Sequence, residues 1–104
     1  MQSLKQPVLW DEGISAYLEL EYDRLQAPLT TANLQHIAND KAVRVGDLLE
    51  TLYLMAIEGA WYHCDEQGSP QHLDEEALND LHAKGRIGPD DLKSFQGVWI
   101  PAVS

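Results

Sequence analysis

The chain has 104 residues, with 17 Asp or Glu against 7 Lys or Arg and a formal net charge of -10 at pH 7. This length provides one hydrophobic core rather than two, and the charge disfavours nucleic-acid binding, which depends on Lys and Arg contacts to phosphates. No segment approaches the roughly 20 apolar residues of a membrane span, and the first residues lack the layout of a signal peptide. With one cysteine and therefore no internal disulfide, we expect a cytoplasmic protein.

The first half of the chain predicts three helices. Apolar residues recur at helical spacing across residues 12–26, just before Pro28, and a second, shorter helix follows a Thr30 or Thr31 cap. The most apolar stretch, residues 45–58, predicts a third helix, and Gly59 stands where a left-handed C-terminal cap belongs. The residues expected on its buried face are Val45, Leu48, Leu49, Leu52, Met55 and Ala56.

The second half predicts a hairpin, a helix and a last strand. Residues 61–64 form the expected strand, which the sequence DEQGSP turns back. Asp74 caps the next helix, with Leu73 and Leu78 as its hydrophobic staple; Leu81 extends its inner face and Gly85 ends it. Pro89 favours one more short helix, and GVWIPA predicts a short strand.

Together these elements predict an α+β fold, a small winged-helix-like domain that is mainly helical, with a β-hairpin and a short C-terminal strand. We expect residues 1–104 to form a single domain. Its parts are the N-terminal helix (12–26), a helix-turn-helix and hairpin (30–72), and a capped helix with a closing strand (73–104).

The segment LQHIANDKAVRVGDLLETLYLMAIEGAWYHCDEQG resembles a winged-helix module, and the resemblance covers roughly residues 30–72. It implies that residues 45–58 form a recognition helix and that residues 61–72 begin the wing. The outward positions would be Asp47, Glu50, Thr51, Leu54 and Glu58. Three carboxylates among them would face phosphates, so a winged helix used for protein docking or dimerisation fits the charges better than one that binds DNA.

Residues 60–102 are also similar to the bacterial GYF-type domain, which opens on an aromatic "WY" strand and closes near "GW.PA". That domain is an interaction module, so both resemblances imply partner binding rather than catalysis. They disagree about the fold of residues 60–104. The matching positions are Trp61, Tyr62, Gly68, Leu78, Leu81, Gly85, Ile87, Leu92, Trp99, Pro101 and Ala102.

Residues 63–65 and the nearby His72 and His82 carry the side chains for metal or thiol chemistry. Adjacent residues of a strand point to opposite faces, so His63 and Cys64 do not bind one ion together, although His63 and His72 could do so across a hairpin. Acidic neighbours at Asp65 and Glu66 disfavour a reactive thiolate. Residues 74–76 complement a helix dipole. We therefore expect no catalytic residue, metal or cofactor.

The aromatic residues carry the remaining prediction. Trp61 and Trp99 either close the core across a small sheet, or one of them joins Tyr62, Phe95 or Trp10 as an anchor for a partner. Whether Trp61 or Tyr62 points outward stays open. The candidate partner-binding residues are Trp61, Tyr62, Asp47, Glu50, Leu54 and Trp99.

These observations predict a small acidic, non-enzymatic regulatory or accessory protein that docks on a protein with a basic surface. Its N-terminal helix is a candidate homodimer contact. One alternative is a winged-helix DNA-binding regulator, and another is an inhibitor whose acidic face imitates nucleic acid. In the DNA-binding alternative, the phosphate contacts would come from Lys41, Arg44, Lys84 and Arg86.

Overall fold

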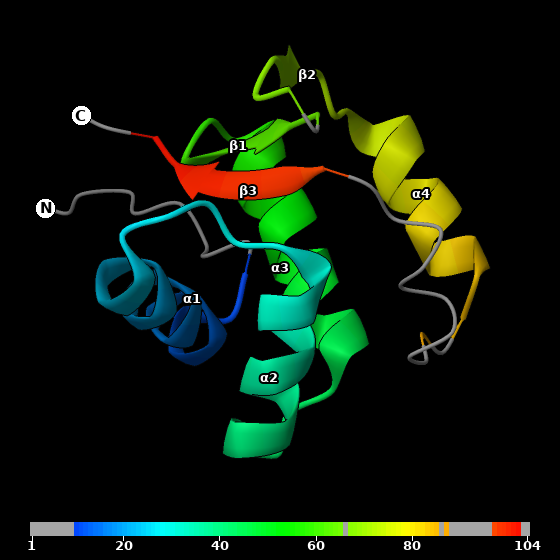
Figure 1. Cartoon of the computed structure of the whole chain (residues 1–104). Helices are drawn as coiled ribbons and strands as arrows, with labels where there is room; N and C mark the ends of the chain where they lie inside the picture. Colours follow the sequence, from blue (N-terminus) through cyan, green and yellow to red (C-terminus); the bar gives the residue numbers. More distant parts are fainter. Residues whose placement is uncertain (1–9, 66, 86, 88–96, 103–104) are drawn as a thin grey trace, which may run out of the picture.

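The computed structural model describes residues 10–65, 67–85, 87 and 97–102, which form a mainly helical α+β fold (Figure 1). This confirms the fold class expected from the sequence. The predicted short helix at Pro89 lies outside the described residues. The helices are α1 (Glu12–Leu25), α2 (Thr31–Lys41), α3 (Val45–Ile57) and α4 (Glu75–Ala83), and the strands are β1 (Trp61–Cys64), β2 (Pro70–Gln71) and β3 (Val98–Pro101).

Local signals set most helix ends. Asp11, Thr30 and Asp74 each accept backbone N–H groups at the starts of α1, α2 and α4, which satisfies donors that have no partner inside a helix. At the end of α3, Gly59 has φ of 84° and donates its N–H to the carbonyl of Ala56. These caps confirm the helix starts and the stop predicted at Gly59.

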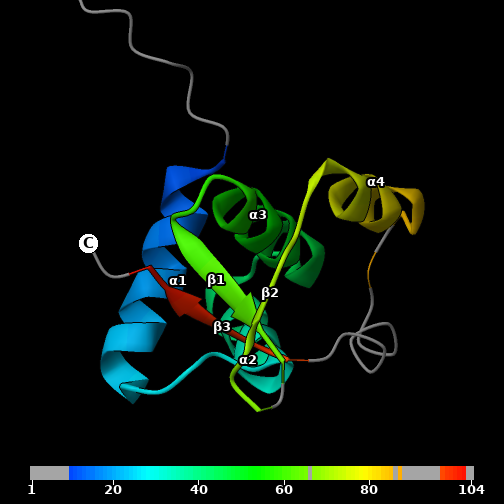
Figure 2. The ribbon, with the colours of Figure 1, turned by 90° about the horizontal axis from the view of Figure 1, so that it is seen from above.

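The three strands form an antiparallel sheet in the order β2-β1-β3 (Figure 2). Trp61 lies opposite Pro101, and the pairing continues to the end of β1. Leu29, between α1 and α2, extends the sheet, because its N–H and carbonyl both bond to Trp99 at 2.9 Å. The last strand is thereby tied to the segment that precedes α2.

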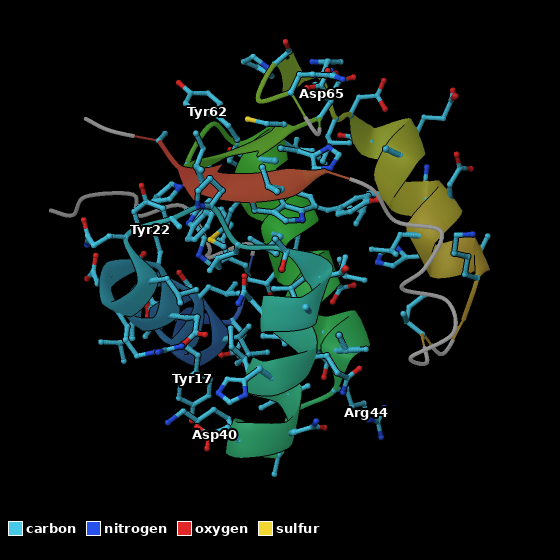
Figure 3. All side chains as sticks on the ribbon, in the orientation of Figure 1. Tyr17, Tyr22, Asp40, Arg44, Tyr62 and Asp65 are labelled. Atoms are coloured by element: carbon cyan, nitrogen blue, oxygen red, sulfur yellow. The ribbon has the colours of Figure 1, made fainter. Side chains whose placement is uncertain are left out.

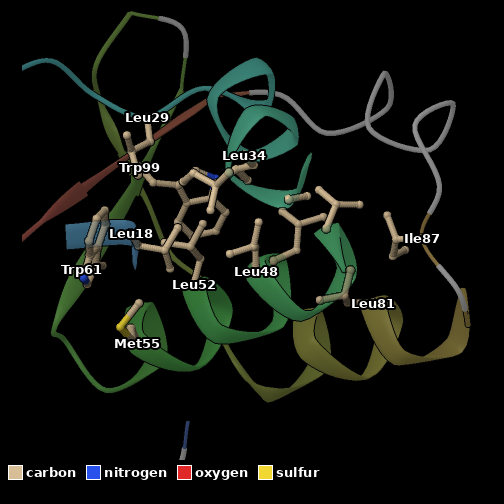
Figure 4. Packing of buried hydrophobic residues seen from close by; sticks show 14 residues of the cluster. Leu18, Leu29, Leu34, Leu48, Leu52, Met55, Trp61, Leu81, Ile87 and Trp99 are labelled. Atoms are coloured by element: carbon tan, nitrogen blue, oxygen red, sulfur yellow. The ribbon is translucent and has the colours of Figure 1, made fainter. Parts of the chain in front are cut away.

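Helix α3 lies at the centre of the molecule and contacts α1, α2, α4 and β1. The core follows it from Trp61 and Met55 at one end to Leu81 and Ile87 at the other (Figure 4). The predicted inner face of α3 is buried, except that Ala56 is only partly covered. No helix among the described residues is both long and apolar enough to cross a membrane.

Candidate functional site

The two aromatic residues that begin β1 have opposite environments. Trp61 is 2% exposed and meets the ring of Tyr22 edge-on at 6.3 Å, whereas Tyr62 is 47% exposed and points away from the helices (Figure 3). Trp99 is also 2% exposed and packs against Tyr53 and His63. The core-closing role of the two tryptophans is thus observed, and neither offers a free surface anchor for a partner.

The residues that suggested metal or thiol chemistry have structural surroundings. His63 stacks on Trp99 at 4.3 Å, while Cys64 lies opposite Val98, so the alternation of the strand separates the imidazole from the thiol. Burial, and secondarily the charge of Asp65, raises the pKa of the Cys64 thiol, which disfavours the reactive thiolate. Among the described residues, no group of three or more His, Cys, Asp or Glu could hold a metal ion.

Three aspartates use their carboxylates to organise the backbone. Asp65 Oδ1 accepts the N–H groups of Gln67 and Ser69 at 2.9 Å each and so shapes the turn after β1. Asp11 and Asp74 cap helices. These side chains are therefore explained by turn and helix geometry rather than by acid–base chemistry.

Helix α3 does not present the open outward face that a recognition helix needs. Asp47 is its only exposed residue. Thr51, expected to face outward, is 3% exposed, and its hydroxyl donates to the carbonyl of Asp47 at 2.8 Å. Glu50 and Leu54 are partly buried. The expectation for Thr51 is corrected: α1, α2 and α4 all pack on α3, which leaves this helix little open surface.

A cleft of about 580 Å³ separates the start of α3 from the end of α4. His82 Nε2 lies 2.5 Å from Glu50 Oε2 across it, and Arg44 and Asp47 also line it. The His82–Glu50 contact is an exposed polar link between α4 and α3.

The residues proposed for phosphate contacts lie beside carboxylates. Lys41 Nζ is 3.4 Å from Asp40 Oδ2 and 5.5 Å from the centre of the Tyr17 ring. Arg44 shares its cleft with Asp47 and Glu50. Lys84 ends α4 and is exposed, and Arg86 lies outside the described residues. The described members of this set do not form a basic patch.

A groove of about 530 Å³ runs between α1 and the sheet, where β1 begins and β3 ends. We call it the α1–sheet groove. Its apolar lining includes Trp10, Met55, Trp61, Pro101 and Ala102. Its charged lining residues are Glu12, Glu19 and Asp23, all on α1, and its described lining includes no Lys or Arg. Beside it, Leu20 is 63% exposed on the same helix.

A shallower hollow of about 360 Å³ lies between the start of α1 and α3. It brings together three residues that the sequence placed at a partner interface, Asp47, Glu50 and Leu54. Trp10 lines this hollow and the α1–sheet groove alike. The two depressions and Trp10 form a surface that combines apolar area with negative charge, which we call the α1 docking surface.

Searches of protein-family models, curated proteins and solved structures found no match to this chain.

Sequence reasoning did not single out the carboxylates of the α1–sheet groove. Glu12, Glu19 and Asp23 look like the ordinary solvated face of an amphipathic helix. The available signal was the apolar pair Ala16 and Leu20 in the midst of that face, both of which are exposed. The groove itself depends on where β3 packs, which no local pattern specifies.

Proposed function

We propose that this protein is a small acidic, non-enzymatic regulatory or accessory protein that docks on a partner protein with a basic surface. The observation that carries the proposal is the α1–sheet groove, which has partly exposed apolar lining at Trp10, Pro101 and Ala102 and only carboxylates as its described charged lining. Apolar contacts supply binding energy, while complementary charge raises the association rate and selects the partner.

The burial of α3 favours docking over the DNA-binding alternative. A helix that enters the major groove must expose the side chains that read base edges, whereas α3 exposes Asp47 alone. The winged-helix resemblance covers only α2, α3 and the β1–β2 hairpin, and α4 and β3 follow outside it. A winged helix adapted for protein contacts is consistent with the proposal.

The charge also bears on the remaining alternatives. Self-pairing through α1 would bring Glu19 and Asp23 of two copies together, and like charges at an interface are unfavourable, so a different, basic partner is favoured over a homodimer. An acidic inhibitor that imitates nucleic acid is a special form of the proposal. It requires that duplex DNA compete for the same partner.

Two matched variants test the proposal by affinity capture from the native cells with quantitative mass spectrometry. E19K/D23K reverses two exposed charges one helical turn apart on α1, and E76K/D80K reverses a pair of the same spacing on α4. We expect a partner that wild type and E76K/D80K retain, that E19K/D23K loses, and that binds again as a purified protein. Equal capture by both variants, or duplex DNA as the bound species, would refute the proposal.

A further inference from the structure

We infer that the α1–sheet groove receives a basic amphipathic helix from the partner rather than an added β-strand; this inference rests on the proposed function. The edge of β3 beside the groove is closed to another strand. The N–H and carbonyl of Trp99 are already bonded to Leu29 at 2.9 Å, and Pro101 has no N–H to donate. Main-chain pairing, on which strand addition depends, is therefore blocked at this edge.

Helix α1 offers a surface suited to helix packing. Glu12, Ala16, Glu19, Leu20 and Asp23 share its outer face because they recur at helical spacing. Ala16 leaves room for another helix to approach to the usual interaxial distance of about 8–10 Å. The exposed Leu20 and the apolar lining of the α1–sheet groove then provide apolar contacts on either side of the approaching helix.

The spacing of the acids specifies the complementary charges. With a rise of about 1.5 Å per residue, Glu19 and Asp23 lie about 6 Å apart along α1, and Glu12 lies about 17 Å from Asp23. A helix lying antiparallel to α1 would match them with Lys or Arg at positions i, i+4 and i+11. Leucine-sized side chains on the same face would reach the partly exposed apolar lining at Trp10, Pro101 and Ala102.

The inference is tested with a synthetic helical peptide of about 18 residues. It carries lysines at i, i+4 and i+11 and leucines at alternating intervals of three and four residues. Calorimetry gives its affinity, and the indole N–H signals of Trp10, Trp61 and Trp99 report its position by NMR. We expect Trp10 and Trp61 to shift more than Trp99, which lies outside the described groove lining. Affinity should fall about tenfold in E19K/D23K and stay within about twofold in E76K/D80K.

Two control peptides complete the experiment, one with glutamates in place of the lysines and one with a central proline that breaks the helix. Both should bind at least about tenfold more weakly. Equal binding of the proline peptide would overturn the helix inference. If E19K/D23K loses a captured partner but the lysine peptide does not bind wild type, the inference fails while the proposed function stands. If E19K/D23K captures the partner as well as wild type does, the proposed function itself is refuted.

Discussion

Trp61 and Tyr62 are neighbours in sequence, yet the free energy of unfolding should respond to them very differently. Trp61 is 2% exposed at the end of the core, and Tyr62 is 47% exposed. Trp61→Ala should lower stability by about 3–5 kcal/mol because a large buried side chain leaves a cavity. Tyr62→Ala should cost under about 1 kcal/mol. Urea denaturation measures both, and equal losses would mean that the assignment of faces is incorrect.

Gly97 is required by its contacts as well as by its backbone conformation. Its φ is 94°, and an added Cβ would lie 2.2 Å from the carbonyl oxygen of Cys64. Gly97→Ala should therefore cost about 4 kcal/mol or more. Gly68, with φ of 88° and open space around it, isolates the backbone strain, so Gly68→Ala should cost about 1–2 kcal/mol. Similar losses in the two variants by urea denaturation would contradict the close β1–β3 approach at Gly97.

The thiol of Cys64 should be unreactive near neutral pH. Burial and the charge of Asp65 raise its pKa, so the protonated form persists to higher pH in the folded protein than in the unfolded chain. A chromogenic disulfide should modify the native protein more than about tenfold more slowly than the denatured protein at pH 7.5. The native rate should rise as the pH becomes alkaline. A fast reaction of the native protein at neutral pH would show instead that Cys64 carries a reactive thiolate.

At the level of whole elements, α2 and α3 differ in how they begin. Thr30 and Asn33 form a reciprocal capping box at α2, whereas Arg44 makes no side-chain cap at α3. Thr30→Ala should therefore lower the free energy of unfolding by about 1 kcal/mol, and Arg44→Ser should raise it by about 0.5–1 kcal/mol. Thermal unfolding compares the two. A loss of stability in Arg44→Ser would show that Arg44 has a structural contact that outweighs the cap.

The elements that the sequence predicted well are those with local signals. Caps at Asp74 and Gly59 and the apolar spacing of α3 depend on neighbours a few residues away. The pairing of Leu29 with Trp99 was not predicted, because it joins residues far apart in the chain and a single extended residue has no periodicity. Thr51 was misplaced for a related reason: the coverage of α3 by other helices is a tertiary property.

For the molecule as a whole, the sequence revealed the net charge but did not show where on the surface the charged side chains gather. The composition already argued against nucleic acid and for a basic partner. Three of the predicted partner residues, Asp47, Glu50 and Leu54, do meet in one hollow. The α1–sheet groove adjoins it only because β3 returns beside β1, across a long intervening segment. The candidate site is thus partly a sequence property and partly a consequence of topology.

The central claim is that a basic partner docks on the α1 docking surface. Zero-length cross-linking tests it most directly, because a carbodiimide joins carboxylates only to amines in direct contact. With the captured partner, we predict that cross-links to partner lysines concentrate on Glu12, Glu19 and Asp23, which line the α1–sheet groove. Cross-links concentrated instead on Glu75, Glu76 and Asp80 of α4 would contradict the account.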